Sequence, residues 1–593
     1  MTFRRSAGRP GGYRWRIAPR WAGAAELARR LRLTPLIAQI LHNRGLEDVE
    51  EVRRFLAPKL TDLHPPELLP GIQLAAERLA RAVRDGQRIC IYGDYDVDGM
   101  TAVAILYRCL ALHGAHVDYY VPHRLEEGYG VNIEAVRRIA DSGAKVLVTV
   151  DCGVSAVEPL SRAAEMGMEV IVTDHHAPPE RLPPAVAVVH PSLPGSEYPN
   201  PELSGAGVAF KLAWQLGRLL AGGERVDEAT REFLLEATSL AALGIIADVV
   251  ALRGENRVLA AYGLRGLASI SHPGIRALIA SAGLTGRRLH SDDVGFALAP
   301  RLNACGRMGH ARLAVELLAR AAPERCRRIA EHLERQNRRR QELERHITLQ
   351  AIEMVERGRL PAPPDHAIVA ASEDWHGGVV GIVASRLVER FGRPAVLIAL
   401  DGERGHGSAR SIEGFHMRDA LAACAEHLES FGGHALAGGL RITAGKVADF
   451  AEAFTSYARD RLSPELLTPA LSIDAEASLA ELSYPVVERL ERLAPFGHGN
   501  PRPVVAVRNA RLLREPLRMG RGGESVSLVV GQDAPSSTGT PQPARMRCVG
   551  FGMGYLTEEL AGANLIDIAG RPVLNHFNGR TSVEMHLCDV RRR

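Results

Sequence analysis

The chain has 593 residues, which is too long for one hydrophobic core and corresponds to about four domains. Its 46% hydrophobic and 24% charged residues match an ordinary globular protein. The net charge of only +4 excludes a strongly basic coat, so any surface that binds nucleic acid must be local.

The eight cysteines are scattered without a CxxC pair, which argues against a zinc finger or a disulfide framework and predicts reduced thiols. The arginine-rich N-terminus lacks the apolar segment of a secretory signal. No apolar run of about 18 residues occurs along the chain. We therefore expect a cytoplasmic protein with no membrane partner.

Strand-like apolar runs alternate with helical patterns from residue 88 to about 250, after an N-terminal extension (1–44). The runs read RICIYG, VDYYV, KVLVTV, EVIVT and VAVVH. This alternation predicts a parallel sheet with crossover helices, in an α/β domain that we assign to residues 45–313.

Three acids follow the first of these runs in the segment IYGDYDVDGMTA: Asp94, Asp96 and Asp98. Two carboxylates ~4 Å apart repel by ~4 kcal/mol at an effective dielectric near 20, so a cation is expected between them. A helix cap explains one such acid but not three. A calcium hand is excluded because the position of its bidentate acid falls in an apolar stretch. The oxygen ligands favour Mg²⁺ or Mn²⁺.

Further acids and imidazoles follow later runs. Asp151 comes directly after KVLVTV, and His175 and His176 follow EVIVT. Asp248 lies in the apolar helical stretch GIIADVVAL, where an unpaired carboxylate would be costly. Because ligands bind at the carboxyl ends of strands in open α/β sheets, we expect these groups to converge on one cleft.

The remainder of the chain predicts three further parts. A charged pattern over 314–357 predicts one long helix, either a solvated connector or an arginine-bearing strut beside nucleic acid, within a connecting region of 314–360. Strands separated by glycine-rich turns at GERGHGSAR and FGGHALAGG predict a second, smaller α/β domain (361–460). Short strands after residue 470 predict a β-barrel (461–593), with a mobile polar loop at 532–544.

The motifs resemble those of a known family. In order, DYDVDG, DCG, DHH and the acid of IADVV resemble the four motifs of the DHH phosphoesterase superfamily. The later RLNACGRMGHA, WHGGVVGIVASRL, GSARS and GGHALAGG narrow this to the RecJ family of single-strand-specific DNA exonucleases. PFGHGNPRPVV and NHFNG resemble that family's OB-like domain. The resemblance implies an α/β fold: a parallel-sheet DHH domain, a long helix, a smaller α/β DHH-associated domain and a C-terminal OB-like barrel.

The resemblance also implies a site with two Mn²⁺ or Mg²⁺ ions. One ion would be held by Asp94, Asp96 and Asp151, and the other by Asp98, Asp151, His175 and Asp248. His176 would contact the scissile phosphate and protonate the leaving oxygen, while Asp174 orients a neighbouring imidazole. His176 and Asp151 are the residues to which the resemblance gives catalytic roles.

The implied DNA contacts form two groups. Arg301, Asn303 and Arg307 would bind the strand, unless these arginines form ion pairs in a loop with nearby acids. Ser408, Arg410 and Ser411 would hold the phosphate at the DNA end, among glycines that expose backbone N–H groups, and His434 would line the same groove.

The implied activity is 5′-to-3′ hydrolysis of single-stranded DNA to mononucleotides in recombination and repair, and the polarity comes from the resemblance alone. Single-stranded DNA is the expected partner, with a single-strand-binding protein and a helicase as further candidates and a monomer as the expected state. Two alternatives remain: a phosphodiesterase of short oligonucleotides or cyclic dinucleotides, and a DHH scaffold without activity in a replication complex.

Overall fold

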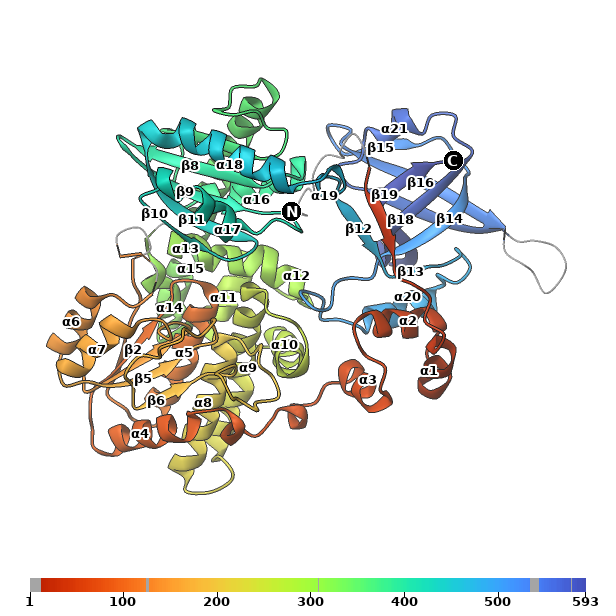
Figure 1. Cartoon of the computed structure of the whole chain (residues 1–593). Coiled ribbons are helices and arrows are strands. Elements are labelled where there is room, and N and C mark those ends of the chain that lie inside the picture. The colour runs from red at the N-terminus through yellow and green to blue at the C-terminus, as the bar shows by residue number, and fades with distance from the viewer. Residues whose placement is uncertain (1–11, 124–126, 129, 308, 534–542, 578) are drawn as a thin grey trace. The chain divides into compact units, whose positions relative to one another are not determined.

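The computed structural model describes residues 12–123, 127–128, 130–307, 309–533, 543–577 and 579–593 (Figure 1). The chain forms two compact units. The α/β unit comprises Glu50–Arg339 and Leu493–Pro501. The composite unit comprises Met1–Val49, Arg340–Arg492 and Arg502–Arg593. Each unit is described by itself.

The α/β unit is built on a five-stranded parallel sheet in the order β3-β2-β4-β5-β6. Every residue of β2 and β4 is buried, as expected for strands that are covered on both faces. The strands are β2 (Ile89–Gly93), β3 (Val117–Tyr120), β4 (Val146–Val150), β5 (Glu169–Thr173) and β6 (Ala187–Val189).

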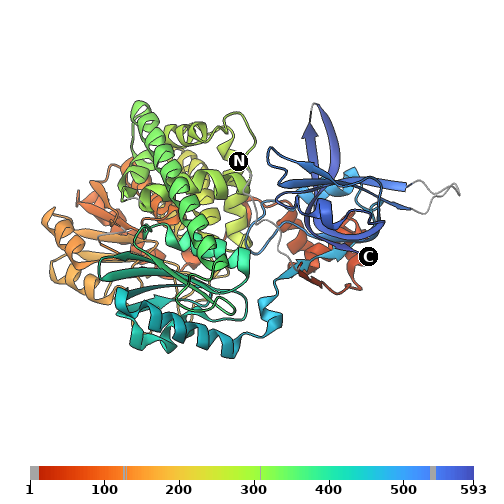
Figure 2. The same ribbon diagram turned by 90° about the horizontal axis from the view of Figure 1, so that it is seen from above.

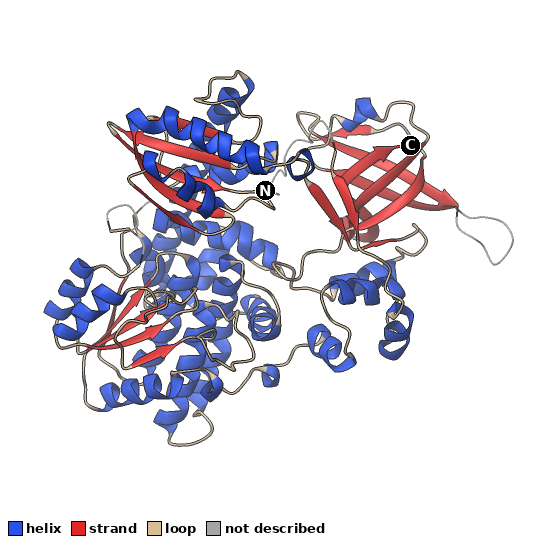
Figure 3. Ribbon diagram, in the orientation of Figure 1, coloured by secondary structure: helices blue, strands red, loops and turns tan. Residues whose placement is uncertain are grey.

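Helices cover both faces of this sheet (Figure 3). One face packs against α4 (Ile72–Arg84), α5 (Val97–Leu112), α8 (Gly205–Ala221) and α9 (Glu228–Asp248). The other packs against α6 (Ile133–Asp141) and α7 (Val157–Glu165). The remaining helical elements of this part are α3 (Val49–Leu56), η1 (Leu60–Asp62), η2 (Pro66–Leu68), α10 (Gly254–Leu267), α11 (Pro273–Ser281), α12 (Ser291–Asp293), η3 (Val294–Leu298), α13 (Ala299–Arg307) and α14 (Ala311–Ala319).

The predicted long helix is present, but it begins at Pro323 and not near residue 314. The chain forms α14, breaks at 320–322 and starts α15 (Pro323–Glu356), the long green helix in Figure 2. Proline disfavours helical geometry in the residue before it and suits the first position of a new helix, so Pro323 ends one helix and begins the next.

The composite unit contains a five-stranded sheet in the order β10-β11-β9-β8-β7. Its α18 packs on one face and α16 on the other. The elements are β7 (Ile368–Ser372), α16 (Val380–Phe391), β8 (Ala395–Asp401), β9 (Arg404–Arg410), α17 (Met417–Ala423), η4 (Ala425–His427), β10 (Ser430–Gly433), β11 (Ala437–Thr443), η5 (Ala444–Lys446), α18 (Val447–Arg461) and α19 (Pro464–Leu467).

Of the glycine-rich segments predicted as turns, FGGHALAGG does hold the turn between β10 and β11, whereas most of GERGHGSAR is a strand of this sheet. GERGHGSAR runs into β9, which pairs with β8 on one side and β11 on the other. Gly405 and Gly407 lie in this strand because an added Cβ would press on Ile398 and Leu440. The backbone N–H groups of β9 are therefore part of the sheet, and the expectation that they approach an anion is wrong.

The C-terminal part is a small barrel of seven strands in the order β13-β14-β18-β19-β17-β16-β15, closed by a pairing of β14 with β16. The elements are β12 (Ala470–Ile473), β13 (Ala475–Glu476), α20 (Tyr484–Glu491), β14 (Val505–Leu512), β15 (Leu517–Met519), β16 (Ser525–Asp533), β17 (Pro543–Gly550), α21 (Leu556–Glu559), β18 (Leu565–Phe577) and β19 (Arg580–Arg592). Residues 534–542 of the predicted mobile loop lie outside the described residues.

The N-terminal extension is joined to the chain's far end. Its strand β1 (Arg14–Ile17) pairs in parallel with β12, and it continues into α1 (Ala24–Leu31) and α2 (Pro35–Asn43). Trp15 Nε1 donates a hydrogen bond of 2.6 Å to Asp589 Oδ2. The sequence did not predict this pairing, since four-residue strands separated by about 450 residues leave no periodic signal.

Candidate metal centre

The site lies at the carboxyl ends of three neighbouring strands. Asp94 follows β2, Asp151 follows β4 and Asp174 follows β5. The residues before them are paired in register, Gly93 with Val150 and Val150 with Thr173. The three carboxyl groups therefore emerge side by side at one edge of the sheet, as the sequence predicted.

The start of α5 supplies two further acids. Asp96 caps this helix by accepting a hydrogen bond of 3.0 Å from the Gly99 N–H. Asp98 lies in the first turn and is fully buried. Its carboxylate accepts hydrogen bonds from the N–H groups of Gly205 (2.7 Å) and Ala206 (3.1 Å) at the start of α8. The positive end of a second helix thus holds Asp98 in place.

Asp151 has an unusual backbone. Its φ of 59° lies in the left-handed region, which costs a residue other than glycine about 1–3 kcal/mol. Its side chain is buried, and burial together with the charge of Asp98 raises its pKa well above the ordinary range. A strained backbone and a strongly shifted pKa at the same residue are typical of a functional position.

The two adjacent histidines are set to opposite protonation states. Burial lowers the pKa of His175 to about 4, so its imidazole is neutral at pH 7. Burial alone would also lower the pKa of His176, but a 2.8 Å hydrogen bond between its Nδ1 and Asp174, with the charge of that carboxylate, raises it to about 9. Asp174 therefore orients and charges His176, while the neutral ring of His175 suits a metal ligand.

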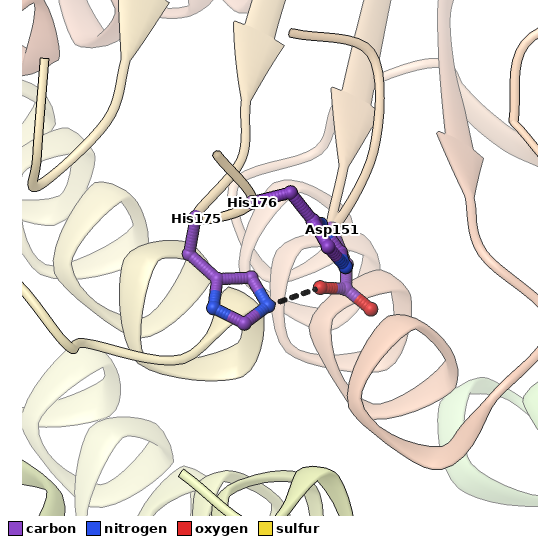
Figure 4. A group of neighbouring side chains, drawn as sticks. All are labelled: Asp151, His175 and His176. Carbon is purple, nitrogen blue, oxygen red and sulfur yellow. Dashed lines mark ion pairs between the residues drawn. The ribbon is translucent and has the colours of Figure 1, made fainter. Parts of the chain in front are cut away.

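His175 is the point at which three acids meet. Its Nε2 lies 3.1 Å from Asp151 Oδ1, 3.6 Å from Asp248 Oδ2 and 3.8 Å from Asp98 Oδ2. Figure 4 shows the ring directed at Asp151. Asp248 is the last residue of α9, so it ends the helix instead of lying inside it as the sequence suggested.

Three groups could each hold an ion, since the candidate ligand atoms of each lie within 4.8 Å of one another. They are Asp94 with Asp96 and Asp151, Asp98 with His175 and Asp248, and Asp151 with His175 and His176. The structure thus brings together all six residues predicted as ligands. Asp151 belongs to the first group and also contacts His175 of the second, so its carboxylate lies between them.

The buried polar atoms of this site fit a divalent cation. Asp94 Oδ1, Asp151 Oδ1 and His175 Nε2 are buried and form no hydrogen bond with any described residue. Burial and the charge of Asp96 raise the pKa of Asp94 to about 7 and that of Asp248 to about 6. Acids that repel one another and lack donors are stabilised by a cation, and the mixed oxygen and imidazole set suits Mn²⁺ or Mg²⁺.

Two glycines that were not predicted as site residues make room for these acids. A Cβ at Gly205, at the start of α8, would overlap Asp151 Oδ1, and one at Gly244, in α9, would overlap Asp98 Oδ1. Sequence reasoning missed both glycines, because each lies about 54 residues or more from the acid it faces and neither has a positive φ. Only the folded packing identifies them.

Replacing Gly244 with alanine is therefore expected to weaken metal binding. The added methyl group displaces the Asp98 carboxylate, so the rise in melting temperature that saturating Mn²⁺ gives should shrink or vanish. Thermal unfolding with and without Mn²⁺ measures this effect.

Gly217→Ala, in helix α8, is the matched control, since its methyl group would meet Thr230 Cγ2 of α9 at 2.5 Å, away from the acids. The control should lower the melting temperature to a similar degree but keep the full response to Mn²⁺. An unchanged Mn²⁺ response in Gly244→Ala would show that Gly244 does not position Asp98.

The first predicted group of DNA contacts lies on a helix, not in a loop. Arg301, Asn303 and Arg307 belong to α13. The Arg301 guanidinium donates to the Ala297 carbonyl at 2.7 Å and pairs with Glu334 of α15 at 2.8 Å. Arg301 is thus an anchor between α13 and α15 in this structure, and the alternative of pairing with a nearby acid holds for this residue.

The second predicted group lies on the sheet of the composite unit. Ser408 and Arg410 point to one face of β9, and Arg410 donates to Ser408 Oγ at 3.1 Å. Ser411 donates its hydroxyl to the Phe415 carbonyl at 2.6 Å. His434 lies in the turn between β10 and β11 and is exposed.

Comparisons with known proteins agree with this fold and site. The chain matches the DHH family N-terminal domain over residues 88–245, the DHHA1 domain over 365–460 and the RecJ OB domain over 473–589. These matches define a DHH-type protein that carries a DHHA1 domain and an OB domain.

Individual relatives narrow the class. The single-stranded-DNA-specific exonuclease RecJ of Bacillus subtilis strain 168 is 38% identical over 97% of this chain and 70% of its own length. That of Escherichia coli K12 is 37% identical over 80% of this chain and 83% of its own length. The solved structure of RecJ with Mn²⁺ from Thermus thermophilus matches with a TM-score of 0.81 and 32% identity, over 99% of this chain and 80% of that one. The chain belongs to the RecJ family.

Proposed function

We propose that this chain is a metal-dependent exonuclease that hydrolyses single-stranded DNA from the 5′ end to mononucleotides, in DNA recombination and repair. The observation that carries the proposal is the cluster of five carboxylates and a neutral imidazole at the carboxyl ends of the strands. The relatives of this chain support the proposal, because they are named single-stranded-DNA-specific exonucleases.

We assign one ion to Asp94, Asp96 and Asp151 and a second to Asp98, Asp151, His175 and Asp248. Related structures were solved with Mn²⁺ and with Mg²⁺. When bound, a pair of such ions lowers the pKa of a water and offsets the negative charge of the phosphodiester during in-line displacement. The chain's part is to fix the carboxylates: α8 holds Asp98, and the helix N-terminus of α5 holds Asp96.

His176 is suited to protonate the leaving oxygen. Its side chain is 42% exposed, whereas that of His175 is 11% exposed, so His176 is the imidazole that a substrate reaches. Its raised pKa keeps a proton on the ring at neutral pH, and Asp174 holds Nδ1, so Nε2 is the nitrogen that would face the phosphate. This is the arrangement of a general acid with a carboxylate behind it.

Replacing His176 with alanine is expected to lower the rate of hydrolysis by about a hundredfold or more, the usual contribution of a general acid. Because His176 is not an assigned ligand, the stabilisation by Mn²⁺ should remain. Single-turnover hydrolysis of a labelled strand, together with thermal unfolding in Mn²⁺, measures both quantities. A variant that retains full activity would remove His176 from the mechanism.

For the DNA, we propose that Arg301, Asn303 and Arg307 line the path of the strand in the α/β unit. Arg301 would then be a positioning residue, because its ion pair with Glu334 holds α13 in place. In the composite unit we propose that Ser408, Arg410, Ser411 and His434 receive the phosphate at the DNA end, with the guanidinium of Arg410 as the charged group.

Two features favour this function over the alternatives. A phosphodiesterase of short oligonucleotides or cyclic dinucleotides has no need of an OB barrel, which typically binds an extended strand. A scaffold without activity has no need to keep a buried, repulsive set of six ligands. Neither alternative explains both the barrel and the acids.

The test uses a single strand labelled differently at its two ends. With Mn²⁺, we expect mononucleotides to leave the 5′ end first, and a dinucleotide to be cleaved far more slowly than the long strand. Faster cleavage of the dinucleotide would favour the phosphodiesterase, and no release of nucleotide would favour the scaffold.

We further propose that the protein works as a monomer in the cytoplasm, beside a single-strand-binding protein and a helicase. The two partners are proposed for a chemical reason. Duplex DNA yields a single strand only when a helicase unwinds it, and a single-strand-binding protein keeps the exposed strand from pairing again. No helix in the described part of the chain is long and apolar enough to cross a membrane.

A further inference from the structure

One face of the sheet in the composite unit is covered over only half of its width. On β8, Ala395, Leu397 and Ala399 pack in the core that includes α16. Opposite them on β9 lie Arg410, Ser408 and His406, which share this face because paired residues point the same way. From His406 the face continues onto β11 and β10 as exposed residues: Arg441, Gly439, Ser430 and Gly432.

This open half of the face is hollowed. A depression of about 270 Å³ is lined by His406, Ser430, Phe431, Gly432, Gly439 and Arg441. All of them come from β9, β10 and β11, so the hollow is formed by one sheet and needs no second unit.

Two glycines form its floor, although neither the backbone conformation nor the packing requires glycine at these positions. Gly432 and Gly439 are paired across β10 and β11, and neither has a positive φ. A Cβ at Gly432 would meet nothing within 4 Å, and one at Gly439 would meet only the Gly407 carbonyl at 3.9 Å. The neighbouring Gly438 differs, since its Cβ would press on Leu421 at 2.7 Å. Glycine that packing does not require indicates the close approach of a ligand to the backbone.

Two side chains that can bind an anion border this floor, and neither is held by another described side chain. Arg441 and His406 are opposite one another on β11 and β9, and both are exposed. Neither side chain forms an ion pair or a hydrogen bond with a described residue, in contrast to Arg410, which donates to Ser408 and to the Ala409 carbonyl. A guanidinium free of carboxylates is a ready partner for a phosphate.

We propose that this hollow binds one nucleotide of single-stranded DNA, with its phosphate on Arg441 and its base over the Gly432–Gly439 floor. The inference rests on the proposed function and extends it. His406, Ser408 and Arg410 alternate along one strand, ~6.6 Å from each to the next, so the hollow continues towards the residues proposed for the DNA end. A negative strand lying along this row meets positive or neutral groups throughout.

The test measures binding of a fluorescent single strand to the full chain carrying Asp151→Asn, which keeps the DNA intact. In this parent, Arg441→Ala is expected to weaken binding by about tenfold and to reduce the slope of log affinity against log salt by about 0.7, the loss of one phosphate contact. Gly432→Val should weaken binding to a similar degree, leave the salt slope unchanged and leave the melting temperature unchanged or raised, since the added side chain meets open space.

The matched control is Arg459→Ala, an exposed arginine of α18 on the opposite face of the sheet. It should bind the strand as the parent does. If Arg441→Ala and Gly432→Val also bind as the parent does, the hollow is not a DNA subsite and the inference is overturned while the proposed function stands. If the parent itself binds no single strand, the proposed function fails, and this inference fails with it.

Discussion

Replacing Asp151 with asparagine is expected to lower the hydrolysis of single-stranded DNA by about a thousandfold or more. Asp151 is the one carboxylate that lies between the two groups of ligands, so its loss affects both ions. Two ions contribute several kcal/mol to the stabilisation of charge in the transition state, and each 1.36 kcal/mol corresponds to a factor of about ten in rate.

The Asp151→Asn variant should be more stable than the unsubstituted chain when no metal is present. Folding raises the pKa of Asp151, so its charge costs stability at every pH above the ordinary range of a carboxyl group. Asparagine removes this cost and keeps the shape. We expect a higher melting temperature in a chelator, together with a smaller rise on adding Mn²⁺.

Rates of nucleotide release and melting temperatures with chelator or Mn²⁺ check both expectations. Asp141→Asn serves as the control, because Asp141 is an exposed acid at the end of α6 and should change neither quantity. If the Asp151→Asn variant is as active as the unsubstituted chain and is stabilised by Mn²⁺ to the same degree, the assignment of Asp151 as a ligand of both ions is contradicted.

Replacing Lys211 with methionine is expected to destabilise the α/β unit by about 3–5 kcal/mol, the cost of breaking a buried ion pair from one side. Lys211 and Glu255 are fully buried and form a salt bridge. Lys211 also donates to the His64 carbonyl, and Glu255 accepts from the His64 N–H at 2.8 Å and from the Tyr198 hydroxyl. Methionine fills the volume but leaves the Glu255 carboxylate without its cation.

Chemical unfolding followed by circular dichroism measures this loss. Lys145→Met is the control, since Lys145 is one of only four lysines (59, 145, 211 and 446) and is exposed. Adding Glu255→Gln to Lys211→Met should recover part of the loss, because the uncompensated charge is removed. A single variant that unfolds within about 1 kcal/mol of the parent would show that the pair does not stabilise the fold.

The sequence predicted the α/β sheet and its acidic edge well, because two physical signals are strong there. Strands buried on both faces give continuous apolar runs, and the acids stand directly after them. The parallel register then places Asp94, Asp151 and Asp174 next to one another, whatever the intervening helices are.

Other features depended on contacts that no local pattern carries. β9 and β11 contain so many glycines that they resemble turns, yet large side chains of neighbouring elements occupy the space above Gly405, Gly407 and Gly438. Gly205 and Gly244 serve the acids only after α8 and α9 pack on α5. The break before Pro323 was a local signal, and the periodic apolar pattern on both sides of it concealed the break.

A crystal structure of the full chain grown with Mn²⁺, with data collected at the manganese absorption edge, tests the central claim most directly. Two anomalous peaks are expected at the carboxyl ends of β2, β4 and β5. One should contact Asp94, Asp96 and Asp151, and the other Asp98, Asp151, His175 and Asp248. A crystal that shows no manganese at this edge of the sheet, or manganese bound only by other residues, would contradict it.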